Sequence, residues 1–438
     1  MSQFHDIAVK ALETAQKLGA QGTRASISRS QNLEISWRQK KIENMSSAGE
    51  SALTLALFVD GKYGIYQTSD LRTDSVQSFI EKGIAMTRLL EEDPARQLAD
   101  PELYKDRPEI DLEKYDQNVV DFTPAQAIEK CKELEELCMK HDEFPIIDVN
   151  VGIESSISES YLAISNGFEG SSKSTYMGLS GDIIYADGER KPSGYDYTQC
   201  CFLNDMRSAQ DIADKAAHYA KMKIGQKKLA SGNRTLIFDR RAASSMINYF
   251  LSPLSGSSLI MKRSYFENKI GESFASALLD LHDEPLIKRG LGSRLYDSDG
   301  ISAKSATFFD KGILKQYLLD VYSANKLGLK PTTGNFSNLV LTPGKRSLDE
   351  MIADVKNGIY VIGLMGGNMD EVRGDFSHGI VGVAIEKGKL TTPVSEMNIT
   401  GNHTTLWKKL VEIGNDPNPE TSKRIPSFRI DDVSVSGN

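Results

Sequence analysis

Residues 53–59 constrain the fold more than any other stretch, because six of the seven are apolar and a turn follows directly. A short, almost continuous apolar run of this kind is typical of a buried strand. Asp60 and Gly61 come next and favour a tight turn into a second strand over residues 63–66. The pattern therefore predicts a β-hairpin in the first part of the chain.

Amphipathic helices are predicted on both sides of this hairpin. Apolar residues recur at helical spacing over residues 4–18 and again over residues 76–87. Residues 1–91 are therefore expected to form one α/β unit. The next segment, residues 92–122, carries three prolines among many charges, which is typical of a linker or a crossing loop.

Residues 123–231 are expected to combine helices with antiparallel hairpins. Thr123 is followed by proline and then by Gln126, which together indicate a capped helix start with a capping-box partner. Strand-forming residues and glycine-containing turns dominate residues 146–202. A further helix is predicted over residues 208–224 because small apolar residues recur there at helical spacing.

The second half, residues 232–438, opens with a short strand at 235–238 and a largely apolar helix at 240–251. Beyond this helix most segments have the pattern of strands, with turn sequences at residues 310–312 and 386–389. The predicted class is α+β: an N-terminal α/β region followed by a β-rich C-terminal domain with packed helices.

Charge and composition argue against two classes of partner. The net charge is −8 and the basic residues are scattered, so direct nucleic-acid binding is not expected. No stretch approaches the ~18 apolar residues that a membrane span needs, and the N-terminus lacks the pattern of a signal peptide. Four cysteines without other signs of secretion favour reduced thiols and a cytoplasmic location.

Several local strings occur in order along the second half of the chain. They are Ser255-Gly256-Ser257-Ser258, Lys262-Arg263-Ser264, Tyr296-Asp297-Ser298-Asp299-Gly300, Thr333-Gly334-Asn335-Phe336, Gly374-Asp375-Phe376-Ser377-His378-Gly379 and Ile413-Gly414-Asn415-Asp416. Together with the order of the elements they resemble the TldD/PmbA family, known as modulators of DNA gyrase and as peptidases. The Asp-Phe-Ser string and the last one resemble the PmbA branch, also called TldE.

The resemblance implies a barrel-like C-terminal domain and a paired assembly. In that assembly a TldD-type subunit supplies zinc and a His-Glu-x-x-x-His motif, and a PmbA-type subunit joins it. The implied activity is degradation of unfolded or extended peptides in the cytoplasm. The resemblance thus places zinc in a TldD-type partner.

The helix that should correspond to the metal-binding one cannot supply ligands. A catalytic zinc needs three protein ligands from His, Cys, Asp or Glu, and a neighbouring glutamate usually takes the proton from its water. Residues 242–253 contain none of these four residue types. No two of the six histidines lie within five residues of each other. No metal or other cofactor is therefore expected in this chain; His378 and His403, with Asp375, would make only an improvised site.

The leading interpretation is a non-catalytic, PmbA-type subunit that helps to hold an extended peptide. A strand-rich domain suits this role because a peptide can add to it as a strand. The partner is expected to be a TldD-type subunit, with a homodimer left open. Glycines that let two backbones approach closely place the predicted peptide groove at Gly366, Gly367, Asn368, Asp375, Phe376, Ser377 and His378.

Two other functions stay open at this point. One is a metallopeptidase that acts alone through an unrecognised site, recruiting His378 or His403. The other is a modulator that binds gyrase, which follows only from the older name of the family. Neither a catalytic residue nor a preferred peptide is identified by the sequence.

Overall fold

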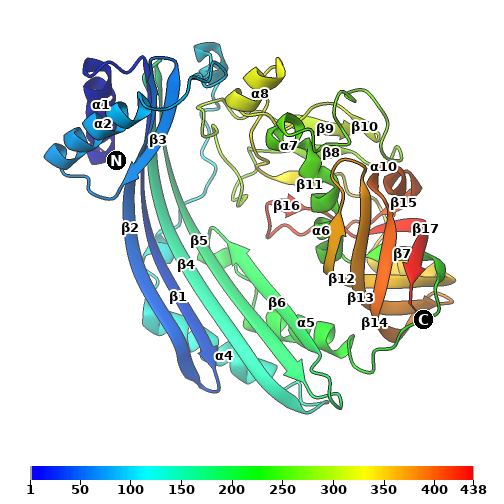
Figure 1. Cartoon of the computed structure of the whole chain (residues 1–438). Helices are drawn as coiled ribbons and strands as arrows, with labels where there is room; N and C mark the ends of the chain where they lie inside the picture. The colour runs from blue at the N-terminus through cyan, green and yellow to red at the C-terminus, as the bar shows by residue number, and fades with distance from the viewer. Residues whose placement is uncertain (1, 438) are drawn as a thin grey trace.

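The computed structural model describes residues 2–437, which form two parts lying side by side (Figure 1). The N-terminal part is built on one long, curved sheet with the strand order β3-β2-β1-β4-β5-β6. Every neighbouring pair in it is antiparallel. Its strands are β1 (Gly22–Arg38), β2 (Lys41–Val59), β3 (Lys62–Thr68), β4 (Ile146–Ile164), β5 (Phe168–Tyr185) and β6 (Ser193–Cys200).

The predicted hairpin at the start of the chain is confirmed. β2 and β3 pair from Val59 and Lys62 outward, and the turn residues Asp60 and Gly61 have φ of 54° and 74°. Positive φ at both positions is the geometry that matches the twist of the paired strands.

Strands from both sides of residues 92–122 share this one sheet. β1 pairs with β4 all along, from Arg24 opposite Ile164 to Arg38 opposite Asn150. The connecting segment runs outside the sheet and holds the short helices η1 (Pro101–Tyr104) and α3 (Gln117–Val120). The predicted units 1–91 and 123–231 are therefore joined by continuous strand pairing.

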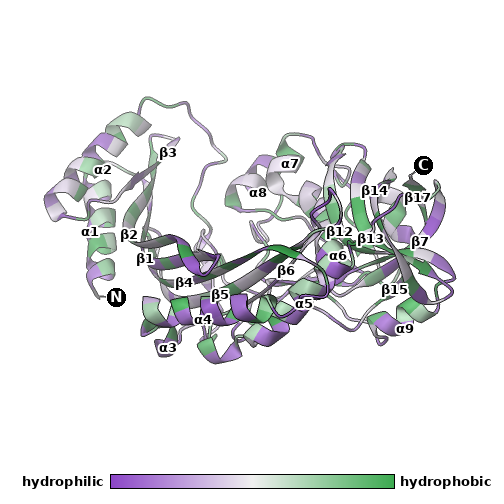
Figure 2. Ribbon diagram, turned by 90° about the horizontal axis from the view of Figure 1, so that it is seen from below, coloured by the Kyte–Doolittle hydropathy of each residue, from purple (hydrophilic) through white to green (hydrophobic). Residues whose placement is uncertain are grey.

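Four helices cover the sheet at its two ends (Figures 1 and 2). At one end lie α1 (Ser2–Lys17) and α2 (Thr73–Thr87), and at the other lie α4 (Pro124–Cys138) and α5 (Ala209–Lys221). α4 begins with the predicted capping box, in which the Thr123 backbone N–H donates to the Gln126 side chain at 2.8 Å.

The C-terminal part contains a closed barrel, as the resemblance implied. Its strands are β7 (Gly232–Phe238), β12 (Asn357–Met369), β13 (Asp375–Glu386), β14 (Lys389–Asn402) and β17 (Phe428–Ser436), and β15 (Leu410–Ile413) pairs with β17. The order β14-β13-β12-β7-β17 closes because β14 also pairs with β17.

A second, smaller sheet and several short helices complete the C-terminal part. The sheet consists of β8 (Leu281–Asp283), β9 (Ala306–Asp310), β10 (Ile313–Leu314), β11 (Leu339–Leu341) and β16 (Lys423–Arg424). The helices are α6 (Arg240–Leu251), α7 (Gly256–Ile260), α8 (Val321–Leu327), α9 (Leu348–Ala353) and α10 (His403–Leu406), with short 3-10 turns at η3 (Ser252–Leu254) and η4 (Trp407–Lys409). A further 3-10 turn, η2 (Leu203–Asp205), lies in the N-terminal part between β6 and α5. The predicted hairpins at residues 310–312 and 386–389 are confirmed.

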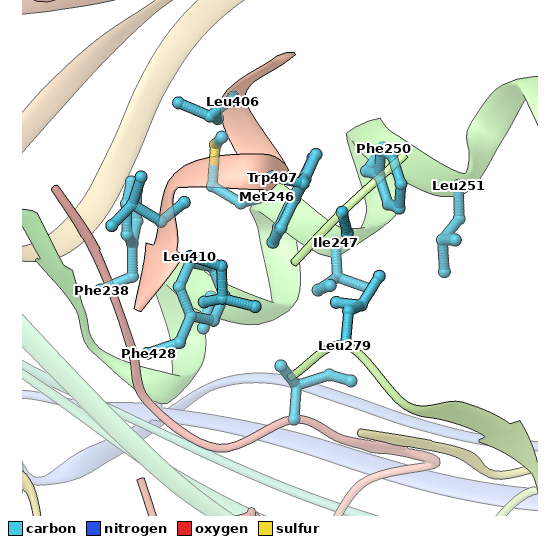
Figure 3. Packing of buried hydrophobic residues seen from close by; sticks show 14 of the residues in the cluster. Phe238, Met246, Ile247, Phe250, Leu251, Leu279, Leu406, Trp407, Leu410 and Phe428 are labelled. Carbon is cyan, nitrogen blue, oxygen red and sulfur yellow. The ribbon is translucent and has the colours of Figure 1, made fainter. Parts of the chain in front are cut away.

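The main core lies between α6 and one face of the barrel strands. Figure 3 shows Phe250 of α6 and, around the helix, Phe238, Trp407 and Phe428. Their rings make a chain of contacts: Phe250 to Trp407 at 4.9 Å, and Trp407 to Phe428 at 5.3 Å between centroids. α6 is thereby held rigidly in the core, which determines which of its residues face outward.

Candidate peptide-binding cleft

The start of α6 is held by a buried carboxylate. Asp239 caps the helix by accepting from the Arg241 backbone N–H at 2.9 Å. It also accepts from the Tyr219 hydroxyl of α5 at 3.0 Å and from the Tyr360 hydroxyl of β12 at 2.7 Å. Burial, together with the charge of Asp239, raises the pKa of both tyrosines, so both remain protonated donors. One carboxylate therefore ties α6 to both parts of the molecule.

The outward face of α6 carries no side chain of the kinds that bind zinc. The buried face consists of Ala242, Ala243, Met246, Ile247, Phe250 and Leu251. The residues that remain partly accessible are Arg240, Arg241, Ser244, Ser245, Asn248 and Tyr249. Across residues 2–437, no group of three or more His, Cys, Asp or Glu is placed to hold a metal ion.

Two hollows flank this outward face, one at each end of the helix. The N-terminal hollow has a volume of about 470 Å³ and lies between α6, Tyr195 and Tyr197 of β6, and the loop 418–423. The C-terminal hollow has a volume of about 690 Å³ and lies between Tyr249 and the segment 367–372. We call the outward face of α6 with these two hollows the α6 cleft.

The seven residues predicted to form a peptide groove do lie together, at the paired ends of β12 and β13. Asn368 is opposite Ser377, and Met369 is opposite Phe376. Gly367 and Asn368 line the C-terminal hollow. Asp375 instead accepts from the Asn402 side chain at 2.8 Å.

Two of the seven residues predicted for the enclosed peptide groove are buried and do not line the C-terminal hollow. The side chains of Phe376 and His378 lie in the core, 5% and 0% exposed. They alternate with Ser377 along β13, so both point to the same face of the strand, and that face is the core. Phe376 and His378 therefore pack in the core beneath the strand ends that border the C-terminal hollow.

The two glycines form a bulge that makes room for His378. The strand pairing shifts between Met365 and Asn368, and Gly366 and Gly367 have φ of 58° and 132°. A Cβ on Gly367 would lie 2.2 Å from Nδ1 of His378. Only glycine fits there, because the His378 ring packs directly against this backbone.

The predicted convergence of His378 and His403 occurs inside an aromatic cluster. The ring of Phe376 lies 5.3 Å from that of His378 and 4.6 Å from that of His403. Nδ1 of His403 accepts from the Trp407 indole at 3.2 Å. Burial lowers the pKa of His403 to about 3, so the ring is neutral at physiological pH. Asp375 does not join the histidines, because its carboxylate is bonded to Asn402 on the surface.

An ionic network links the N-terminal hollow to the long sheet. Asp196 of β6 is 1% exposed and pairs with Arg241 of α6 and with Arg207. Arg207 also pairs with Glu420 of the C-terminal part at 2.9 Å. These residues were not singled out from the sequence, because they are distant along the chain and lack a motif.

Three family profiles match almost all of this fold. PmbA/TldA metallopeptidase domain 1 matches residues 24–87, the central domain matches 118–224, and the C-terminal domain matches 231–437. The chain belongs to the PmbA/TldD metallopeptidase family. No helix among residues 2–437 of this family member is long and apolar enough to cross a membrane.

One curated relative and two solved structures are similar to this PmbA/TldD chain over nearly their whole length. "Metalloprotease PmbA" of Escherichia coli O157:H7 is 25% identical over 98% of this chain and 96% of its own. A candidate modulator of DNA gyrase from Bacteroides thetaiotaomicron has a TM-score of 0.96 and 40% identity, covering 99% of both chains. TldE from Thermococcus kodakarensis has a TM-score of 0.88 at 20% identity, covering 98% of this chain and 100% of its own, and shows the shared fold.

Proposed function

We propose that this chain is the non-catalytic, PmbA-type subunit of a cytoplasmic TldD/PmbA peptidase assembly, and that it holds an extended peptide in the α6 cleft. The observation that carries the proposal is the outward face of α6. A TldD-type subunit is expected to carry two histidines and a glutamate on this helix. The outward face of α6 presents arginine, serine, asparagine and tyrosine instead. Such side chains donate and accept hydrogen bonds, but they do not coordinate zinc or take the proton from a zinc-bound water.

The shape and chemistry of the cleft support peptide holding. Main-chain amides are matched by hydroxyl and amide side chains, which Ser244, Ser245 and Asn248 provide along the helix. The bulge at Gly366 and Gly367 leaves backbone uncovered by side chains at the C-terminal hollow. Polar groups of this kind contact any peptide sequence, which suits a protein that handles unfolded chains.

The free cysteines are consistent with the proposed cytoplasmic setting. All four are buried as free thiols. Burial raises the pKa of Cys131 and of Cys138 to about 12, so neither is a reactive thiolate. Unreactive buried thiols support a reducing, cytoplasmic compartment.

Metal content and peptidase activity of the purified chain test the proposal. Alone, the chain is expected to hold less than stoichiometric zinc and to leave an unfolded peptide uncut. Mixed with a TldD-type subunit that contains His-Glu-x-x-x-His, it is expected to elute as a larger species and to allow EDTA-sensitive cleavage. Stoichiometric zinc with EDTA-sensitive cleavage by the chain alone would establish the metallopeptidase alternative instead.

The same preparation distinguishes the partners. Light scattering after gel filtration separates a homodimer of this chain from a heterodimer. Gyrase binding, the third interpretation, predicts co-purification with gyrase when no TldD-type subunit is present.

A further inference from the structure

The N-terminal hollow of the α6 cleft is lined by cations without an acidic residue. Arg240, Arg241 and Lys423 all line it. The other lining residues, all in the described part of the chain, are tyrosines, serines, Thr421, asparagine, glutamine and Leu291, with no Asp or Glu. The stacked rings of Tyr195 and Tyr197, 5.5 Å apart, form one wall.

The nearby carboxylates point elsewhere, so two of the three cations stay unneutralised. Asp196 forms ion pairs with Arg207 and Arg241. Glu420 forms an ion pair with Arg207 and accepts a hydrogen bond from the Thr198 hydroxyl. Within residues 2–437, neither Arg240 nor Lys423 has an ion pair, although Lys423 is half-buried. Burial lowers the pKa of Lys423, and no carboxylate beside it opposes that effect.

The position of the arginines is also unfavourable for the helix itself. Arg240 and Arg241 occupy the first turn of α6, which contains no acidic residue. The N-terminal end of a helix carries partial positive charge, so cations there destabilise it and anions stabilise it. Arg241 is accounted for by its ion pair with Asp196, and Asp239 already caps this end of α6. Neither contact accounts for Arg240, whereas a bound anion would be favoured by Arg240 and by the helix end.

We propose that the N-terminal hollow binds a carboxylate of the extended peptide, with Arg240 and Lys423 as its cationic contacts and the tyrosines packing against the neighbouring side chain. This inference rests on the proposed peptide-holding function and adds a substrate class to it. A peptide offers such a carboxylate at its C-terminus or on an Asp or Glu side chain. Both have the same planar, two-oxygen geometry, which arginine and lysine bind by charge-assisted hydrogen bonds.

Binding of fluorescent peptides to the intact chain, measured by anisotropy, tests the proposal. One ten-residue sequence is made in four forms: with a C-terminal carboxylate or amide, and with an internal Glu or Gln. The form with both carboxylates is expected to bind about 5- to 10-fold more tightly than the form with neither. The two single-carboxylate forms show which source supplies the group.

Variants assign the effect to this hollow. Lys423→Gln and Arg240→Gln are each expected to remove most of the preference for the carboxylate, and to weaken binding of the charged peptide much more than binding of the neutral peptide. Lys389→Gln, an exposed lysine at the start of β14, is the matched control and keeps the full preference.

Two results would overturn the proposal in distinguishable ways. If the neutral and charged peptides bind equally well, the carboxylate site is wrong and the peptide-holding function stands. If no form of the peptide binds, the peptide-holding function itself fails, and the carboxylate site with it.

Discussion

At the residue scale, adjacent glycines in β12 differ in what surrounds them. Gly366→Ala places a Cβ in open space at φ of 58°, which costs about 1–2 kcal/mol of left-handed strain. Gly367→Ala adds a clash with Nδ1 of His378 and the Ser377 carbonyl, so we expect a total loss of about 3 kcal/mol or more. Urea unfolding of both variants measures the difference. Equal losses would show that the His378 ring does not hold this backbone in place.

The buried histidines give stability a defined dependence on pH. The pKa of His403 is about 3 in the folded chain, below its ordinary value of 6.5. The unfolded state therefore binds the extra proton, and stability present above pH 6.5 is lost as pH falls. Between pH 6.5 and pH 5 we expect the free energy of unfolding to drop by up to about 2 kcal/mol from this residue.

The variant His403→Phe isolates that contribution. It leaves the Trp407 indole without its acceptor, so it should be less stable at pH 7.5. Its stability should nevertheless fall less between pH 7.5 and pH 5 than that of the unmodified chain. An unchanged pH dependence would mean that His403 is already protonated, or solvated, in the folded state.

At the scale of elements, the local sequence pattern predicts the bounds of α6 but not the residues that α6 contacts. An apolar helix at 240–251 followed from residue spacing, and the structure has the same bounds. The capping role of Asp239 has a local signal, a short acidic residue before the helix. Its bonds to Tyr219 and Tyr360 have none, because those partners lie 20 and 121 residues away. The burial of His378 was missed for the same reason.

A prediction at this scale concerns the cap of α6. Asp239→Ala removes the cap and leaves the buried hydroxyl of Tyr360 and the partly buried hydroxyl of Tyr219 without an acceptor, so we expect a loss of about 3–4 kcal/mol. Thr123→Ala, in the exposed capping box of α4, should cost about 1 kcal/mol. Thermal unfolding by circular dichroism compares the two. A loss at Asp239 no larger than that at Thr123 would contradict its role in joining the elements.

At the scale of the whole molecule, the arrangement depends on pairings that leave no local pattern. The β1–β4 pairing joins residues more than a hundred positions apart, such as Ile35 with Ile153. The hydrophobic alternation in each strand indicates a buried face but not the identity of the neighbour. The family resemblance implied the barrel, because strand order is inherited with the sequence strings. The N-terminal hollow of the α6 cleft lies where the long sheet meets the C-terminal part. Its position could not be predicted from the sequence, because no local pattern places these two parts together.

The two parts should be coupled through Arg207. This side chain, 21% exposed, pairs with the buried Asp196 of the sheet and with Glu420 of the C-terminal part. Arg207→Met removes the pair with Glu420 and leaves Asp196 with Arg241 as its partner, so it is expected to cost about 1–3 kcal/mol. Arg289→Met also breaks ion pairs between the parts, but at 41% exposure it should cost less than about 1 kcal/mol. Urea unfolding is followed by the fluorescence of Trp37 in the N-terminal part and Trp407 in the C-terminal part. If the Arg207→Met and Arg289→Met variants unfold at the same urea concentration, Arg207 does not couple the two parts.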